Sequence, residues 1–166
     1  KQLSQWVAAD DWTALEAFVK AFQDAVLALR YAPFPVVAVP WGLALGGGCE
    51  FSMGVDGRVA EAELKMGLVE TQVGVIPGGG GCKKIARRNG DDIDAAFEVL
   101  FKGYFSANAY QARTWGLLNP DDPIHMGYEQ ALRAGIDLVQ RLAESYDAPA
   151  KERIATAGSA AITRLT

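Results

Sequence analysis

The chain has 166 residues, of which 50% are hydrophobic and 22% charged, values that are typical of a globular domain with one hydrophobic core. Its net charge of -4 argues against general nucleic-acid binding, which needs a basic face to neutralise phosphates, and no apolar run approaches the length of a membrane span. Two cysteines, Cys49 and Cys82, lack the spacing of a disulfide framework, so we expect reduced thiols and a cytoplasmic location.

The first predicted element is a helix over about residues 11–31. Its apolar residues recur at steps of three and four, and they are Leu15, Phe18, Val19, Phe22, Val26 and Leu29. This spacing predicts that one face of the helix is core. Residues 32–35 contain two prolines, which end the helix, and the β-branched run 36–39 is predicted to be a buried strand.

A short helix with glycines at its entry is predicted over residues 46–54, followed by short strands over 57–60 and 63–66. The second half is predicted to be helical. Helices are expected over 82–88, 93–101, 107–115 and 128–146, the last with Leu132, Ile136, Val139 and Ala143 on one face. Residues 147–166 could form a helix or a tail.

Two carboxylates each stand beside a glycine-rich turn. Glu50 follows glycines 46–48, and Glu70 precedes Pro77 and glycines 78–81. Glycine lets the backbone turn sharply and approach a ligand closely, and the first amides of the following helix point outward with partial positive charge. Such donors contribute about 3 kcal/mol each to a transition state that carries an oxyanion. Apolar surroundings would raise the pKa of Glu50 toward neutrality, so the pattern suggests an acid/base site.

Each of these features also has a structural explanation. Glycine clusters alone more often mark turns, and Glu50 could merely complement the helix dipole. Cys49 could be a nucleophile at a helix N-terminus, but no base accompanies it. The single histidine, His125, is expected in an exposed polar loop, and Met66 could line an acyl pocket or fill the core.

A basic patch is predicted on the helix that follows the second glycine run. Lys83, Lys84, Arg87 and Arg88 fall on one side of this helix because residues four apart share a face. The patch could contact the charged part of a coenzyme A ligand. Clustered charges are more often a solvated surface, and the sequence leaves both interpretations open.

These residues resemble the crotonase, or enoyl-CoA hydratase/isomerase, family, and most of all the crotonase-type domain attached to 3-hydroxyacyl-CoA dehydrogenases. The resemblance is carried by PVVAVPWGLALGGGCE (35–50), Asp56, MGLVE (66–70), GVIPGGGG (74–81) and, more weakly, SANAYQA (106–112) and GLL (116–118). Asp56 is expected to be a structural turn residue. The resemblance implies an α/β crotonase-like ββα spiral fold, with a partial core over 1–118, its active-site region over 35–81, and a C-terminal helical region of the same domain over 119–166.

The same resemblance implies roles for individual residues. The Gly47 amide would form part of the oxyanion hole, Glu50 and Glu70 would be the acid/base pair, Gly78 would help to hold the reacting water, and Met66 would line the acyl pocket. The substrate would be an acyl-CoA thioester, with coenzyme A present only as part of it and no other cofactor or metal. The family further implies a homo-oligomer of the trimer type or fusion to a dehydrogenase domain.

Possession of both glutamates favours a hydratase in fatty acid β-oxidation, acting on trans-2-enoyl-CoA. A Δ3-Δ2 enoyl-CoA isomerase and a non-catalytic assembly module of the same fold are the alternatives. Because the chain begins at Lys1, close to its first predicted helix, we expect the N-terminal part of the domain, with the second oxyanion donor, to be absent. This piece alone would then have little activity.

Overall fold

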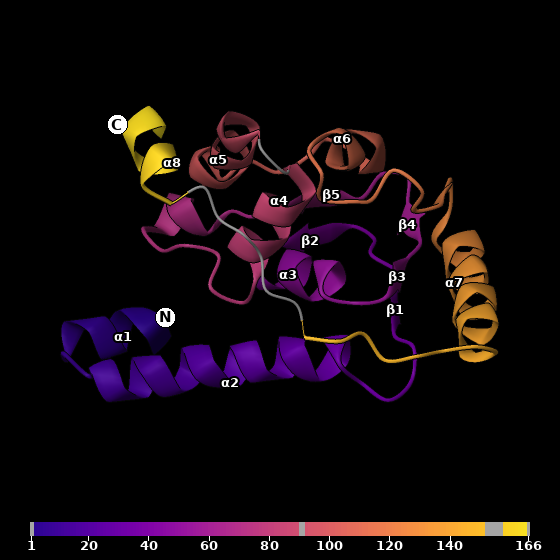
Figure 1. Ribbon diagram of the computed structural model, residues 1–166, viewed down its shortest axis with the longest axis horizontal. Coiled ribbons are helices and arrows are strands. Elements are labelled where there is room, and N and C mark those ends of the chain that lie inside the picture. Colours follow the sequence, from indigo (N-terminus) through magenta and orange to yellow (C-terminus); the bar gives the residue numbers. More distant parts are fainter. Residues whose placement is uncertain (1, 90–91, 152–157, 166) are drawn as a thin grey trace.

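The computed structural model describes residues 2–89, 92–151 and 158–165, and it has an α/β architecture (Figure 1). Two helices, α1 (Gln2–Ala8) and α2 (Trp12–Arg30), lie along one side of a body made of short strands and further helices. The strands are β1 (Val37–Ala38), β2 (Leu43–Leu45), β3 (Gly57–Arg58), β4 (Ala60–Glu61), β5 (Lys65–Gly67) and β6 (Ile124–His125). The body helices are α3 (Gly47–Met53), the 3-10 helix η1 (Glu70–Val73), α4 (Gly81–Asn89), α5 (Ile93–Lys102), α6 (Ala109–Thr114), α7 (Tyr128–Ala143) and α8 (Gly158–Leu165).

The strands pair in parallel, β1 with β3, β2 with β5, and β4 with β6. A parallel pair requires the chain to cross over between its two strands. Helix α3 lies in the crossover from β2 to β5, directly after β2 ends at Leu45. This topology places the first glycine turn at the carboxyl end of β2, in which only Ala44 is buried.

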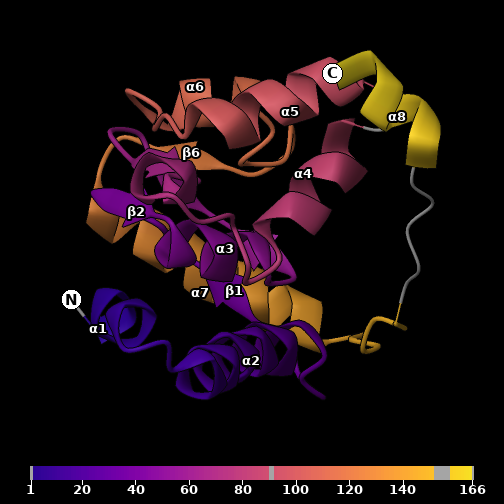
Figure 2. The ribbon, with the colours of Figure 1, turned by 90° about the vertical axis from the view of Figure 1, so that its left-hand side faces the viewer.

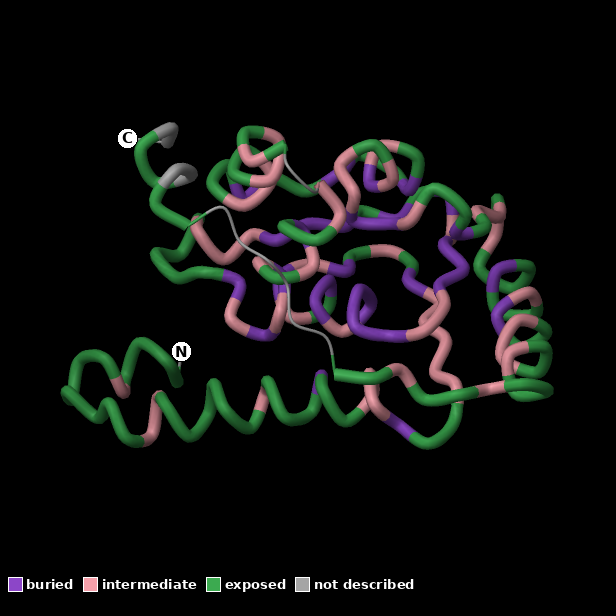
Figure 3. Tube along the Cα trace, in the orientation of Figure 1, coloured by how far each residue is buried: buried purple, intermediate pink, exposed green. Residues whose placement is uncertain are grey.

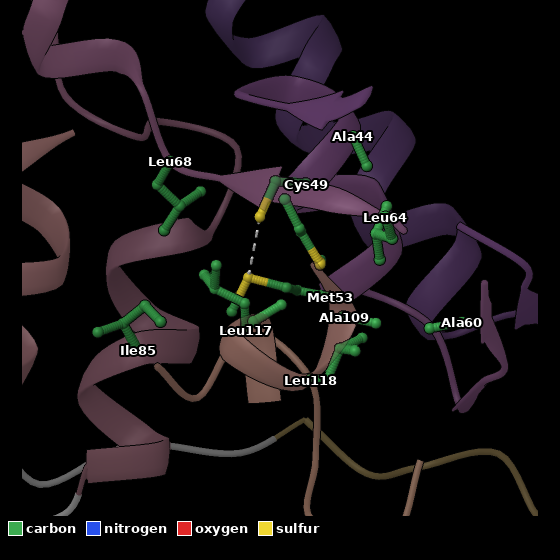
Figure 4. Close-up of a cluster of buried hydrophobic side chains, with 12 residues drawn as sticks. Ala44, Cys49, Met53, Ala60, Leu64, Leu68, Ile85, Ala109, Leu117 and Leu118 are labelled. Atoms are coloured by element: carbon green, nitrogen blue, oxygen red, sulfur yellow. Dashed lines mark hydrogen bonds between the residues drawn. The ribbon is translucent and has the colours of Figure 1, made fainter. Parts of the chain in front are cut away.

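The hydrophobic core lies between the strands and helices α3 to α6. Its members come from both halves of the chain: Ala44, Cys49, Met53, Ala60, Leu64, Met66, Leu68, Ile85, Ala109, Ala112, Leu117 and Leu118. Figure 4 shows the side chains of Met53, Ile85 and Leu117 pointing toward one another from separate elements. In Figure 3 the buried segments accordingly gather in the body, whereas α1 and α2 are almost entirely exposed.

Helix α2 corrects one expectation. The helix forms at the predicted place, with Asp11 as an N-cap whose side chain accepts a hydrogen bond from the Ala14 amide at 3.0 Å. Val26 is its only buried residue, so the apolar face predicted to be core is mostly exposed. Phe18, for example, is 46% exposed and Trp12 is 57% exposed. Periodicity identifies an apolar face, but it does not say how much of that face is covered.

Helix α7 packs through a different face from the one predicted. Leu132 and Ile136 are exposed, while Ala131 and Gly135 are buried. A Cβ on Gly135 would stand 2.5 Å from a methyl group of Val39, so this glycine permits the close approach of α7 to the chain that follows β1. Two small residues, together with the half-buried Leu138 that packs against Gly57, therefore mark the contact face.

Most of the other predicted helices and strands lie within a few residues of the observed ones, and the region after residue 147 contains helix α8. The sequence did not predict α1, β2, η1 or β6, and the run 36–39, predicted to be a buried strand, is only half-buried. His125 is a further exception, because it lies half-buried in β6 instead of in an exposed loop. Its carbonyl accepts a hydrogen bond from the Ala62 amide at 2.8 Å, and the Pro123 carbonyl accepts one from the Ala60 amide at 2.9 Å. Among the described residues, no helix combines the length and apolar character needed to cross a membrane.

Candidate acid/base site

The first glycine turn is built by Gly46. This residue has a φ of 53°, in the left-handed region where a Cβ would be strained, and its amide donates a hydrogen bond to the Gly67 carbonyl at 2.8 Å. The next residue, Gly47, begins α3, and the amides of the first helical turn have no partner inside the helix. A Cβ on Gly46 would stand 3.2 Å from Oε1 of Glu70, so the Glu70 carboxylate lies against this turn.

Glu50 lies in the first turn of α3 and is only 3% exposed. Its Oε1 accepts a hydrogen bond from the Gly81 amide at 2.8 Å, and the Gly79 amide also interacts with its carboxylate. Burial raises the pKa of Glu50, the Gly81 amide opposes the rise, and the negative charge of Glu70 adds to it. The second glycine run therefore supplies the donors that hold the first carboxylate.

Gly79 and Gly81 can approach Glu50 only because they have no side chains. A Cβ on Gly79 would stand 2.7 Å from Oε2 of Glu50 and would collide with the ring of Phe22. A Cβ on Gly81 would stand 3.0 Å from Oε1 of Glu50. The glycines thus set the distance between the segment around Glu50 and residues 79–81. This explains why the site needs two glycine turns.

Glu70 begins η1 and is half-buried. Burial raises the pKa of Glu70, and no described residue donates a hydrogen bond to its buried Oε2. A buried carboxylate oxygen without a donor favours the protonated form. Both members of the predicted pair are therefore shifted toward proton exchange at higher pH than an ordinary glutamate.

Glu70 lies against the glycine turn that leads into Gly47 and Glu50, while the roles of these three residues in an acid/base site stay a prediction. Gly78 lies beside them, and its carbonyl accepts a hydrogen bond from Nε2 of Gln23 at 2.7 Å. A water-holding role for the Gly78 amide stays a prediction. Met66 has no exposed surface and belongs to the hydrophobic core, which is the structural alternative that the sequence left open, while a role in an acyl pocket stays a prediction.

Sequence reasoning missed Phe22. Its ring lies over both glycine turns, with Cζ 3.0 Å from the position of a Cβ on Gly47. The ring also meets Phe51 edge to face, with centroids 5.3 Å apart. The position of Phe22 four residues before the buried Val26 was the only available signal, because residues four apart share a helix face.

Glu50 also lines a small cavity of about 60 Å³ between α2, α3 and α4. The other lining residues are Val26, Leu27, Arg30, Tyr31, Gly54, Gly79, Gly80, Lys83, Lys84 and Arg87. Glu70 does not line this cavity. The cavity is therefore bounded by Glu50 and its glycines on one side and by basic side chains on the other.

Cys49 does not have the surroundings of a nucleophile. It is completely buried, and its thiol donates a hydrogen bond to the Met53 sulfur at 3.7 Å (Figure 4). Burial raises the pKa of the Cys49 thiol, and the negative charges of Glu70 and Glu50 raise it further. Among the described residues, no three His, Cys, Asp or Glu side chains form a group that could hold a metal ion.

Comparisons with known proteins identify relatives of this chain. The model of the Enoyl-CoA hydratase/isomerase family matches residues 7–162. A Bacillus subtilis (strain 168) protein named "Probable 3-hydroxyacyl-CoA dehydrogenase" is 35% identical over 90% of this chain, which spans 20% of that protein. The mitochondrial methylglutaconyl-CoA hydratase of Mus musculus is 34% identical over 74% of this chain, which spans 38% of it.

Among solved structures, the enoyl-CoA hydratase from Bacillus anthracis superposes with a TM-score of 0.69 and 27% identity, covering 80% of this chain and 49% of that one. The chain thus spans about half the length of this structure and less of the curated relatives. The match extends over nearly all of the present sequence and carries the same crotonase fold. The chain belongs to the enoyl-CoA hydratase/isomerase, or crotonase, family.

Proposed function

We propose that the complete protein is an enoyl-CoA hydratase of fatty acid β-oxidation that adds water to trans-2-enoyl-CoA thioesters. The observation that carries this proposal is the pair of carboxylates, the buried Glu50 and the half-buried Glu70, whose pKa values are both raised, beside the amide of Gly47 at the start of α3. Hydration requires one group that takes a proton from water and another that delivers a proton to carbon, so two carboxyl groups suit it.

In the proposed mechanism, the Gly47 amide polarises the thioester carbonyl and stabilises the enolate oxygen as negative charge develops. One carboxylate removes a proton from water as the water oxygen forms its bond to the β-carbon. The other carboxyl group delivers its proton to the α-carbon as the enolate collapses. Water is thereby added across the double bond, and the two carboxyl groups exchange protonation states.

The contacts of the two glutamates favour one division of these roles. Glu50 accepts a hydrogen bond from the Gly81 amide and interacts with the Gly79 amide, and such donors favour the ionised form that a base requires. No described residue donates to Oε2 of Glu70, which favours the protonated form that an acid requires. We therefore propose Glu50 as the base and Glu70 as the acid.

The test is Glu50→Gln and Glu70→Gln, made singly in the complete protein. Hydration is followed as the loss of absorbance of the conjugated enoyl thioester. Each variant is expected to lose about 10²- to 10⁴-fold in kcat, because each removes a positioned proton-transfer group. Glu63→Gln is the matched control, since it makes the same change at an exposed position.

The outcome also separates the alternatives. An isomerase that shuttles a proton with one carboxylate would retain 3-enoyl-CoA isomerisation in one of the two variants, and hydration that survives in both variants contradicts the proposal. If an acyl-CoA does not raise the melting temperature of the complete protein, a non-catalytic assembly module is favoured instead, because a ligand that binds the folded state stabilises it.

The wider setting is part of the same proposal. We propose a cytoplasmic enzyme in which coenzyme A enters only as part of the substrate. A fused dehydrogenase region is supported by the similarity to the Bacillus subtilis protein, of which this chain spans 20%. Assembly with copies of itself is the alternative arrangement.

A further inference from the structure

A second cluster of charge lies next to the acid/base site. It surrounds a cavity of about 300 Å³ lined by Arg30, Met53, Val55, Asp56, Arg58, Lys84, Arg87, Arg88 and Asn119. Five of these nine residues are cationic, and they come from α2, β3 and α4. The first part of this cluster was visible in the sequence as the basic patch on α4, but Arg30 and Arg58 reach it only through the fold.

Two carboxylates partly balance the cluster. Arg30 pairs with Asp56 at 3.4 Å, and Arg58 pairs with Asp122 through Nε at 2.6 Å. Asp56 also accepts hydrogen bonds from the Val36 amide and the Tyr146 hydroxyl, at 2.9 and 3.1 Å. The negative charge of Asp56 is thus shared with neutral donors. Among the described residues, Lys84 and Arg88 form no ion pair with a carboxylate.

Lys84 shows most clearly how the neighbouring cations affect one another. It is half-buried, and its ammonium group donates no hydrogen bond to any residue that the structure describes. Burial, together with repulsion from Arg30, Arg58, Arg88 and Arg87, lowers the pKa of Lys84 to about 8. The fold therefore holds this cation where its charged form is disfavoured.

Arg88 is held in the same way. It donates from Nη1 to the carbonyl of Leu117 at 2.6 Å and also to the carbonyl of Gly116. Burial and the neighbouring Arg58 lower the pKa of Arg88 to about 10. These contacts fix the guanidinium at the cavity wall without supplying a negative charge. An anion in the cavity would remove the repulsion felt by Lys84 and Arg88 together.

We propose that this basic cavity is an anion site that binds the phosphate groups of a ligand. Arginine guanidinium groups match the geometry of a phosphate through paired donors, and the lysine adds a point charge. A pyrophosphate group carries enough charge to balance Lys84 and Arg88, and a cavity of about 300 Å³ can hold it. The source is either free pyrophosphate or the diphosphate of a coenzyme A thioester, and the second source rests on the proposed function.

The position of the cavity relates it to the acid/base site. Arg30, Lys84 and Arg87 line both this cavity and the smaller one that Glu50 lines. An anion bound here is therefore separated from Glu50 by the shared wall of the two cavities. Because the basic side chains are nearer to the anion than Glu50 is, binding is expected to raise the pKa of Lys84 more than that of Glu50.

The test measures binding of inorganic pyrophosphate by calorimetry at pH 7 to the wild-type protein, to Lys84→Met, and to Lys102→Met. Lys102 is the matched control, because it lies exposed on α5 and pairs with Glu98 away from the cavity. The wild type and Lys102→Met are expected to bind equally, and Lys84→Met about tenfold more weakly or worse. Absence of binding to the wild type, or equal binding by all three, overturns the proposal.

A pH series with sulfate provides a second measurement that needs no variant. Sulfate keeps its charge over the range, so a change in affinity reports on the protein. The groups that face Lys84 are Arg30 from α2, Asp56 and Arg58 beside β3, and Arg87 and Arg88 on α4. Because Lys84 loses its proton near pH 8, affinity is expected to fall as the pH rises through 8. A constant affinity overturns the assignment of Lys84.

Coenzyme A distinguishes the two sources. If it competes with pyrophosphate and binds about tenfold more weakly to Lys84→Met, the substrate supplies the phosphates. If pyrophosphate binding depends on Lys84 and coenzyme A binding does not, the ligand is a free anion. Either result supports the site. Both are independent of the Glu50→Gln and Glu70→Gln measurements, so a failure of the hydratase proposal would not be mistaken for a failure of the anion site.

Discussion

The acid/base site and the basic cavity lie near each other, and the same physics acts on them with opposite sign. Burial raises the pKa of the carboxyl groups of Glu50 and Glu70 and lowers that of the cations of Lys84 and Arg88. In each cluster burial makes the charged form less stable than it is in solvent. In the functions proposed above, the carboxyl groups exchange protons and the cations bind an anion, so burial in one fold prepares two kinds of chemistry.

The largest expected effect on the free energy of unfolding comes from removing the partner of a buried charge. Asp122→Ala leaves Arg58, which is 3% exposed, unpaired beside other cations. Breaking a buried ion pair in this way costs about 3–5 kcal/mol. The free energy of unfolding, measured by urea denaturation, is expected to fall by this amount.

The exposed pair of Lys20 and Asp24 provides the control for this measurement. Asp24→Ala is expected to cost less than about 1 kcal/mol, because solvent screens the pair. If the two substitutions cost the same, burial does not govern the basic cluster, and the comparison between the two regions fails.

A smaller loss of folding stability is expected when a side chain is placed between the two glycine turns. Gly79→Ala forces a methyl group against Oε2 of Glu50 and the ring of Phe22. Overpacking of this kind costs about 1–3 kcal/mol and is expected to lower hydration as well, since Glu50 must move. Gly48→Ala is the control, because a Cβ there meets nothing within 4 Å. Equal losses in both would show that the turns have room for side chains.

The smallest expected effect is the change of folding stability with pH, which has opposite sign for Lys84 and Glu70. Lys84 has a lowered folded pKa, so unfolding takes up protons between pH 8 and the ordinary value of 10.5, and stability rises with pH over that range. Glu70 has a raised folded pKa, so stability falls as the pH rises above 4.5 through the folded value. Lys84→Met below pH 8, and Glu70→Gln at neutral pH, are each expected to stabilise the protein by about 1 kcal/mol.

The pH series contains its own control for these changes of stability with pH. The gain from Lys84→Met is expected to vanish as the pH approaches 10.5, where the unfolded lysine also becomes neutral. The gain from Glu70→Gln is expected to vanish near pH 4.5, where the unfolded carboxyl group is protonated. Thermal denaturation across the range measures both. A gain that does not change with pH would mean that packing, and not charge, distinguishes the variants.

The sequence predicted the parts of the site that depend on neighbours along the chain. Glycines 46–48 and Glu50 adjoin one another, so the turn, the short helix and the carboxylate in its first turn follow from local rules. The proximity of Glu70 followed from family resemblance rather than from those rules. Contacts between distant segments, such as that of Phe22 with Gly47 and Gly79, depend on packing that no local pattern encodes.

The basic patch shows the same limit. The sequence placed Lys83, Lys84, Arg87 and Arg88 on one side of a helix, with a solvated surface as the more common meaning. The structure exposes Lys83 and Arg87 but half-buries Lys84 and Arg88. Helical spacing gives the direction of a side chain and not what lies opposite it, so the approach of Arg30 and Arg58 could not be foreseen.

The exposed helix α2 has a consequence for how the site is reached. In the views of Figures 1 and 2 it lies outside the body, and its contacts with the body include those of Phe22 with Phe51, Gln23 with Gly78, Val26 with Gly54 and Arg30 with Asp56. Few contacts mean that the amides of α2 exchange their hydrogens through local opening, at lower free energy than those of α4. An opening that removes the Phe22 ring would uncover Gly47 and Gly79 beside Glu50, while the core, to which α2 contributes no residue, would stay packed.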